Sequence, residues 1–154
     1  MHKAFCKTLI GGAVALLASH SAWALLPIEH WTQDSGAQVW LVNSPTIPMV
    51  DVQINFDAGS RRDPASQAGL ASAAAMMAAK GVKANGAQPA LDENAVGEAW
   101  ADLGATFEAA ASNDALSFSL RSLTDTSLLG KAADLAARQM AQPSYDDAVW
   151  QRER

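Results

Sequence analysis

Apolar and polar positions alternate most clearly between residues 49 and 57. The apolar members share one face of an extended chain: Val50, Val52, Ile54 and Phe56. This period of two predicts a strand with one buried face. Runs rich in apolar and β-branched residues predict three more strands, at residues 38–43, 106–111 and 116–120. The turn residues at 112–114 separate the last two strands, which we therefore expect to form a hairpin.

The segments between the strands carry helix signals instead. AGLASAAAMMAAKG, residues 68–81, is rich in strong helix formers, so we expect a helix capped by Ser66 and ended by Gly81. Three further helices are expected: residues 91–103 before Gly104, from Thr124 or Asp125 to Met140, and from about Asp146 to the last residue. This mixed order predicts an α+β fold in which helices cover one face of a mainly antiparallel sheet.

The first 24 residues have the pattern of a secretory signal peptide. A basic head, residues 1–7, precedes the apolar run Thr8 to Ala18, and Ala22-Trp23-Ala24 fits a cleavage site. The apolar run is shorter than the roughly 20 residues that a membrane-spanning helix needs. We therefore expect cleavage after Ala24, an exported periplasmic protein, and no stable membrane span after cleavage.

Removal of that segment changes the charge and cysteine content. The whole chain has 11 Lys and Arg against 16 Asp and Glu, and loss of Lys3 and Lys7 leaves 9 against 16, a formal charge of −7. Without a basic stripe, nucleic acid is not an expected partner. The sole cysteine, Cys6, is lost as well, which excludes disulfides, thiolate metal sites and a cysteine nucleophile.

The segment FDAGSRRDPASQAGLA, residues 56–71, resembles the opening of the M16 family of metallopeptidases, which includes pitrilysin and insulinase. The similarity continues through LGATFEAAASNDALSFSL, residues 103–120, to QRER at residues 151–154. The resemblance implies that residues 25–154 form the N-terminal part of an M16 peptidase domain, truncated relative to the family.

In that family, the G-L-A sequence leads into the zinc motif H-x-x-E-H, whose two histidines bind the metal and whose glutamate is the general base. Alignment on Gly69-Leu70-Ala71 places Ser72 and Met76 at the histidines and Ala75 at the glutamate. A lone serine hydroxyl is a poor zinc ligand, thioether sulfur prefers softer metals, and alanine does not titrate. The resemblance therefore implies a helix without catalytic residues, and Met76 and Met77 are expected to fill core space.

Other residues do not restore the metal site. Beyond the predicted signal the chain has one histidine, His30, which we interpret as a solvated residue of the N-terminal arm. A site with two histidines cannot be built, so we expect no metal and no zinc cofactor. The resemblance places the family's third ligand roughly two turns beyond Arg154, and Glu153 is interpreted as a solvated carboxylate on a helix face.

The resemblance also implies where a peptide would bind. In the family, substrate adds as an extra strand to a sheet edge, which corresponds to Thr106, Phe107, Glu108, Ala109, Ala110 and Ala111. Strand addition depends on main-chain groups and tolerates sequence change. Glu108 stands where the family often has asparagine. An ordinary strand without a ligand is the alternative, and the isolated chain favours it.

Two classes of function follow. The first is an exported M16 protein without activity of its own, acting as the non-catalytic subunit or fragment of a periplasmic peptide-degrading complex, with a zinc-bearing homologue and peptides as partners. The second is a stand-alone binding or scaffold module that reuses the fold, or a truncated fragment without function. Fold alone does not separate them.

Overall fold

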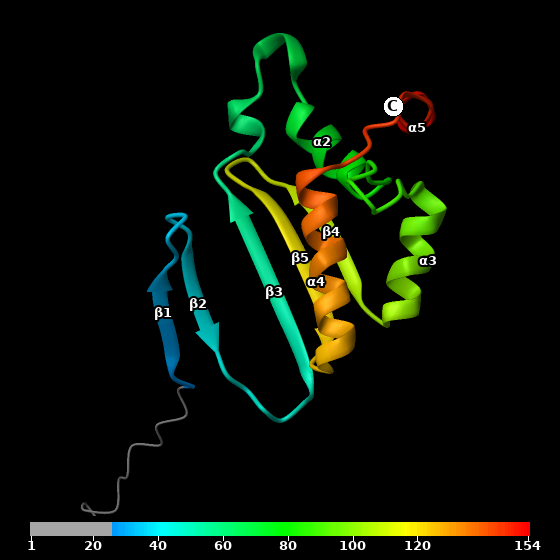
Figure 1. Ribbon diagram of the computed structural model, residues 1–154. Helices are drawn as coiled ribbons and strands as arrows, with labels where there is room; N and C mark the ends of the chain where they lie inside the picture. The colour runs from blue at the N-terminus through cyan, green and yellow to red at the C-terminus, as the bar shows by residue number, and fades with distance from the viewer. Residues whose placement is uncertain (1–25) are drawn as a thin grey trace, which may run out of the picture. The chain divides into compact units, whose positions relative to one another are not determined.

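The computed structural model describes residues 26–154, which fall into two compact units divided after Thr46. The signal peptide predicted for residues 1–24 lies outside the described residues. The first unit is a hairpin in which strands β1 (Ile28–Thr32) and β2 (Gln38–Val42) pair antiparallel (Figure 1). Gly36 adopts φ +86° in its turn, a conformation that glycine reaches without strain.

The second unit is an α+β arrangement around a three-stranded antiparallel sheet of order β3-β5-β4, as Figure 1 shows. Its strands are β3 (Met49–Phe56), β4 (Thr106–Ala111) and β5 (Leu116–Leu123). Its helices are α2 (Leu70–Ala78), α3 (Glu93–Leu103), α4 (Thr126–Ala141) and α5 (Asp147–Glu153), with 3-10 turns η2 (Ser60–Arg62) and η3 (Ala65–Gln67). The central position of β5 leaves β3 and β4 as the edge strands of this described sheet.

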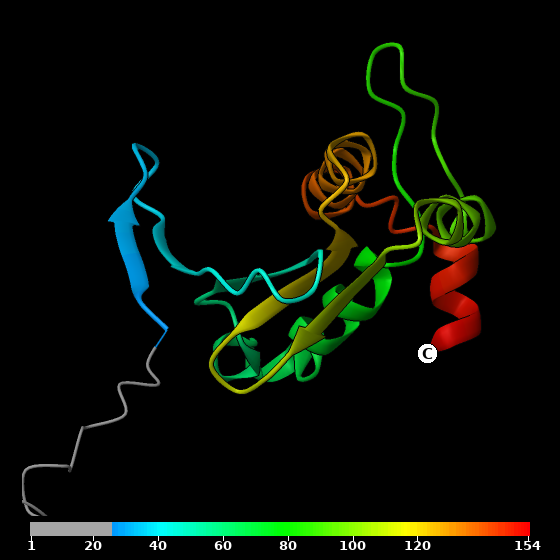
Figure 2. The same cartoon turned by 90° about the horizontal axis from the view of Figure 1, so that it is seen from below.

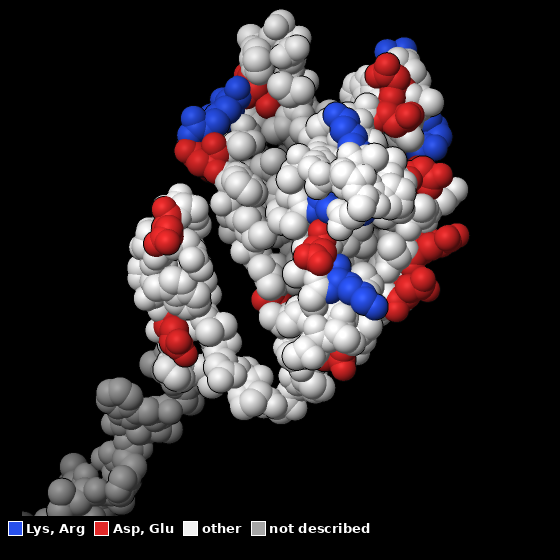
Figure 3. Space-filling view, viewed as in Figure 1, with Lys and Arg blue, Asp and Glu red and all other residues white. Residues whose placement is uncertain are grey.

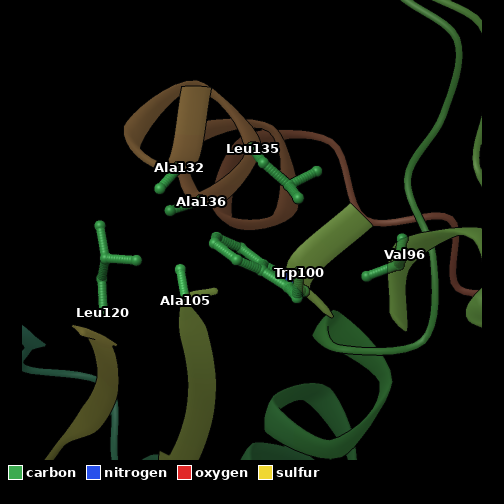
Figure 4. Packing of buried hydrophobic residues seen from close by; sticks show 7 residues of the cluster. All are labelled: Val96, Trp100, Ala105, Leu120, Ala132, Leu135 and Ala136. Atoms are coloured by element: carbon green, nitrogen blue, oxygen red, sulfur yellow. The ribbon is translucent and has the colours of Figure 1, made fainter. Parts of the chain in front are cut away.

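The two faces of this sheet differ in polarity because side chains alternate along each strand. On one face Leu120 of β5 lies opposite Val52 of β3 and Phe107 of β4. The buried cluster on this face contains Val96, Trp100, Ala105, Leu120, Ala132, Leu135 and Ala136 (Figure 4). On the other face Ser119 and Arg121 are exposed. The core therefore lies between one sheet face and the helices, and Figure 2 shows α4 end-on beside the strands. The predicted burial of the apolar face of β3 is wrong, because Val52 and Phe56 are 37% and 48% exposed.

A polar contact inside the core joins three helices. The indole Nε1 of Trp100 in α3 donates to Oε1 of Gln139 in α4 at 2.6 Å. Nε2 of Gln139 in turn donates to the carbonyl oxygen of Ala78 in α2 at 3.3 Å. Gln139 is only 1 % exposed, so these bonds satisfy an amide that would otherwise be costly to bury. The Trp100 ring also stacks on Phe107 of β4 at a centroid distance of 5.6 Å.

The start of α2 differs from the prediction. Ser66 lies in η3 and does not cap the helix, and α2 instead begins after Gly69, which adopts φ +93°. The carboxylate of Asp63 accepts hydrogen bonds from the backbone nitrogens of Gly69 at 2.9 Å and Ala71 at 3.0 Å. A carboxylate from the preceding loop thus satisfies donors that a capping serine was expected to satisfy.

The end of α2 is also earlier than expected. The helix stops at Ala78, and the predicted end at Gly81 is wrong by three residues. Gly81 has φ +143°, and a Cβ there would meet the carbonyl oxygen of Leu91 at 2.9 Å. Val82 then pairs with Leu91 through two backbone hydrogen bonds, at 2.9 and 3.0 Å. Because of this pairing the chain leaves the helical conformation after Ala78. For the same reason α3 begins at Glu93 and not at residue 91.

The remaining boundaries lie close to the predicted ones. Gly104 ends α3 in the left-handed conformation, φ +57°, as expected. Of the two caps considered for α4, Asp125 accepts the bonds from the first turn, and Asp146 does the same for α5. Strand β1 was not predicted, and β5 extends to Leu123 because its last residues pair with the start of β3.

None of the helices within residues 26–154 is long and apolar enough to cross a membrane.

Candidate functional site

The three positions that the resemblance assigned to the zinc motif lie together on α2. Ser72 is exposed, Met76 is half-buried, and Ala75 is 3 % exposed. Because Ser72 and Met76 are four positions apart, they share one side of the helix. They offer one hydroxyl and one thioether and no imidazole or carboxylate, so this donor set does not fit a catalytic zinc ion.

Nearby side chains do not supply a substitute donor set. Within the part of the chain that the structure describes, no group of three or more His, Cys, Asp or Glu residues is placed to hold a metal ion. His30 lies in β1 and is exposed, stacked on the Trp40 ring at 4.8 Å, with Nε2 2.9 Å from Oε1 of Gln38. The histidine is thus exposed, in agreement with its interpretation as a solvated residue, and it belongs to the hairpin of β1 and β2. The absence of bound zinc stays a prediction for the purified protein.

The segment predicted to bind peptide forms β4, an edge strand of the described sheet. Its residues alternate, with Thr106, Glu108 and Ala110 exposed and Phe107, Ala109 and Ala111 half-buried. Helix α2 lies against β4, as the packing between these two elements shows. The structure therefore brings the degenerate helix and the candidate edge strand side by side.

Hydrogen bonding around the hairpin turn determines which main-chain groups of β4 face the open edge. The nitrogen of Ser112 donates to the oxygen of Ala115 at 2.8 Å, so this pair is a hydrogen-bonded one. Bonded and non-bonded pairs alternate in an antiparallel ladder. Ala111, opposite Leu116, and Ala109, opposite Phe118, are therefore non-bonded pairs whose own N–H and C=O groups point away from β5. The N–H and C=O groups of Ala110, opposite Ser117, instead point toward β5 and bond within the sheet.

An open depression of about 520 Å³ lies on the polar face of the sheet. It is lined by Asp51, Val52, Gln53, Thr106, Glu108, Ser119, Leu120 and Arg121. Across it Nε of Arg121 donates to Oδ1 of Asp51 at 2.6 Å, and this hydrogen bond lowers the pKa of Asp51. Glu108 of β4 thus lines this depression together with Arg121 and Asp51.

The loop between β3 and α2 connects both parts of this candidate site. The nitrogens of Ser60 and Arg61 each donate at 2.9 Å to carbonyl oxygens of the β4–β5 turn, those of Ser112 and Asn113. Gly59 approaches the same turn so closely that a Cβ would lie 2.4 Å from the Asn113 carbonyl carbon. Sequence reasoning missed these roles, although the glycine in A-G-S was the available signal.

Acidic side chains outnumber basic ones over the whole chain, 16 Asp and Glu against 11 Lys and Arg. On the part of the chain formed by residues 47–154, Figure 3 shows acidic and basic side chains interspersed over the face that carries α4, with no continuous basic area there.

Comparison with known proteins identifies the class to which this fold belongs. The family described as Insulinase (Peptidase family M16) matches residues 38–154, more than half of the chain. The chain belongs to the M16 peptidase family. Among curated proteins no match was found.

Solved structures show the same fold. A peptidase M16 inactive domain from Pseudomonas fluorescens has 29% sequence identity and a TM-score of 0.74, covering 82% of this chain and 29% of that one. A protease from Helicobacter pylori has 21% identity and a TM-score of 0.67 over 84% of this chain and 29% of that one. Pitrilysin has 24% identity and a TM-score of 0.68 over 86% of this chain and 13% of that one. The chain thus spans less than a third of these structures.

Proposed function

We propose that this chain is an exported, non-catalytic M16 protein that pairs with a zinc-bearing homologue in a periplasmic peptide-degrading complex. One observation carries the proposal: α2 keeps its place beside β4, while the positions of the zinc motif hold Ser72, Ala75 and Met76. The similarity to a domain described as inactive supports it. The partner would supply the metal and the general base. This chain would help to enclose the bound peptide and would contact it.

The proposed peptide contact is strand addition at the open edge of β4. Main-chain groups of Ala109 and Ala111 face that edge, and the small side chains allow a second strand to come close. Proline at Ala109 removes one edge-facing N–H, whereas proline at Ala110 would break the ladder with β5. Ala109→Pro is therefore the informative variant. If it folds and assembles like the wild type and the complex binds peptide unchanged, strand addition here is wrong.

Reconstitution tests the subunit role. The chain is purified alone and together with a homologue from the same genome that carries an intact H-x-x-E-H motif, and complexes are detected by size-exclusion chromatography. We expect co-elution, no peptidase activity from this chain alone, and higher activity from the mixture than from the homologue alone. Robust, chelator-sensitive hydrolysis by the homogeneous single chain would overturn the non-catalytic assignment.

The zinc and export parts of the proposal have separate measurements. Elemental analysis after dialysis is expected to find no stoichiometric zinc, because Ser72 and Met76 stand where the family has its two histidines. About one zinc per chain would contradict this.

N-terminal sequencing of the protein recovered from the periplasm of a Gram-negative cell is expected to begin at Leu25. Recovery of folded protein that still begins at Met1 would contradict export by signal cleavage.

A stand-alone binding module is the second candidate, favoured by the exposed polar depression on the sheet, which does not depend on a catalytic partner. A genome without a neighbouring gene for an intact H-x-x-E-H homologue, together with the absence of co-elution, would favour this candidate over the subunit role.

A further inference from the structure

One carboxylate beside the open edge of β4 has no cation partner among the described residues. Glu108 is exposed on the polar face of the sheet, where it lies opposite Ser119 of β5. None of the ion pairs formed within residues 26–154 includes Glu108. Its negative charge can therefore attract a molecule that binds along the edge of β4.

The cation that lines the same depression is already bound. Nε and Nη2 of Arg121 donate to Oδ1 and Oδ2 of Asp51, at 2.6 and 3.1 Å. Two carboxylates and one guanidinium thus line the depression, and the Asp51 carboxylate offsets the guanidinium. The charge of Glu108 remains in excess. Charge complementarity at this site therefore favours a ligand with a positively charged group.

A strand added at β4 would place some of its side chains beside Glu108. Side chains that lie opposite each other on neighbouring strands point to the same face of the sheet, with Cβ atoms about 4.5–5.5 Å apart. Every second residue of an added peptide, parallel or antiparallel, thus points onto the face where Thr106, Glu108 and Ala110 are exposed. Of these three side chains only Glu108 is charged. The small Ala110 leaves room beside it for a long side chain of the peptide.

We propose that Glu108 selects extended peptides that carry lysine or arginine at the position opposite it. The inference rests on the strand addition proposed above and gives that site a substrate class. An ammonium or guanidinium group at this position meets the Glu108 carboxylate and removes the excess negative charge of the depression. An acidic residue would place like charges directly opposite each other, which is unfavourable between strands.

Fluorescence anisotropy with labelled peptides tests the inference. The peptides are short, extended and identical except for the central residue, which is lysine, glutamine or glutamate. They are titrated with the full chain, alone and mixed with the zinc-bearing homologue, whose metal is removed so that the peptides stay intact. We expect the lysine peptide to bind about two- to fivefold more tightly than the glutamine peptide, the factor that one cross-strand ion pair contributes. The glutamate peptide should bind less tightly than both.

Three variants make the result specific. Glu108→Gln should abolish the preference for lysine, and Glu108→Lys should reverse it in favour of the glutamate peptide. Asp134→Asn is the matched control, because it removes a carboxylate from the exposed side of α4, on the helix-covered side of the sheet, and should leave the preference unchanged. Raising NaCl to about 1 M, where the Debye length falls to roughly 3 Å, should reduce the preference of the wild type.

The outcomes separate this inference from the proposed function. Equal affinity of the wild type for the three peptides, or a lysine preference that survives in Glu108→Gln, would overturn selection by Glu108, even where Ala109→Pro weakens binding and so supports strand addition. Absence of peptide binding, with and without the homologue, would overturn strand addition and the inference together. A preference that Glu108→Gln abolishes, without co-elution of the homologue, would support the inference and contradict the subunit role.

Discussion

Replacing Gly59 by alanine is expected to destabilise the unit formed by residues 47–154 through steric overlap alone. Gly59 has φ −80° and ψ 175°, a backbone conformation that alanine adopts without strain. An added Cβ, however, would lie 2.4 Å from both the carbonyl carbon and oxygen of Asn113 and 2.5 Å from the nitrogen of Ala115. Ordinary contacts of this kind lie near 3.5 Å or beyond, so the loop and the turn have to separate by about 1 Å.

The cost follows from the contacts that such a separation weakens. Two backbone hydrogen bonds cross this junction, from Ser60 to Ser112 and from Arg61 to Asn113, both at 2.9 Å. Each contributes about 1 kcal/mol, and forcing extra volume into a tight contact costs about 1–3 kcal/mol. Because separation relieves overlap while losing the bonds, the two costs are not fully additive, and we expect the free energy of unfolding to fall by about 2–4 kcal/mol.

Urea unfolding followed by tryptophan fluorescence measures this change, because Trp100 lies in the core. Gly97→Ala in α3 is the matched control, since a Cβ there meets no atom within 4 Å. That variant should gain about 0.5–1 kcal/mol from the better helix propensity of alanine. A Gly59→Ala protein within about 0.5 kcal/mol of the wild type, a change typical of neutral surface sites, would refute the steric argument.

Three further outcomes follow from single side chains. Asp63→Ala removes the acceptor for two amides at the start of α2 and should cost about 1 kcal/mol in urea unfolding, whereas an unchanged midpoint would contradict this capping role. Gln139→Leu leaves the indole N–H of Trp100 without its acceptor and should cost about 1–3 kcal/mol, and a more stable variant would contradict it. The pKa of Asp125 is lowered, first by the hydrogen bond from the Ser127 hydroxyl and then by those from backbone N–H groups. The carboxylate therefore stabilises the folded state above the usual aspartate pKa, and this stabilisation is lost as pH falls through the lower pKa of the folded state. Asp125→Asn should reduce the pH dependence of thermal unfolding below about pH 4, and an identical pH profile would contradict this.

Local sequence signals predicted the elements that carry a clean periodic pattern or a terminating glycine. Alternation placed β3, and the left-handed glycine placed the end of α3 at Gly104. The mistakes arose where hydrogen bonding to another segment, rather than a pattern within the element, decides the structure. Strand β1 carries no clean alternation and forms through pairing with β2, and α2 ends early because Val82 pairs with Leu91.

The candidate site shows the same division. The positions of Ser72, Ala75 and Met76 on one helix, and of Thr106–Ala111 on one strand, could be predicted from spacing and resemblance. Which amides of β4 face its open edge could not, because that depends on the hydrogen bonding of the turn at Ser112. The hydrogen bonds from Arg121 to Asp51 join residues 70 positions apart, and no local pattern encodes such pairs.

The segment that carries the family resemblance has a structural role that does not require zinc. Gly59 allows the loop to lie against the turn that ends β4, and Asp63, four residues later, binds the first amides of α2. One short loop therefore sets the helix relative to the edge strand, whichever side chains the helix presents. Both contacts are made by the loop and the helix backbone, so they do not depend on which side chains stand at positions 72, 75 and 76 of α2. A chain with Ser72, Ala75 and Met76 on this helix can thus keep the A-G-S-x-x-D pattern, because the pattern positions the backbone of the edge strand at which we propose strand addition.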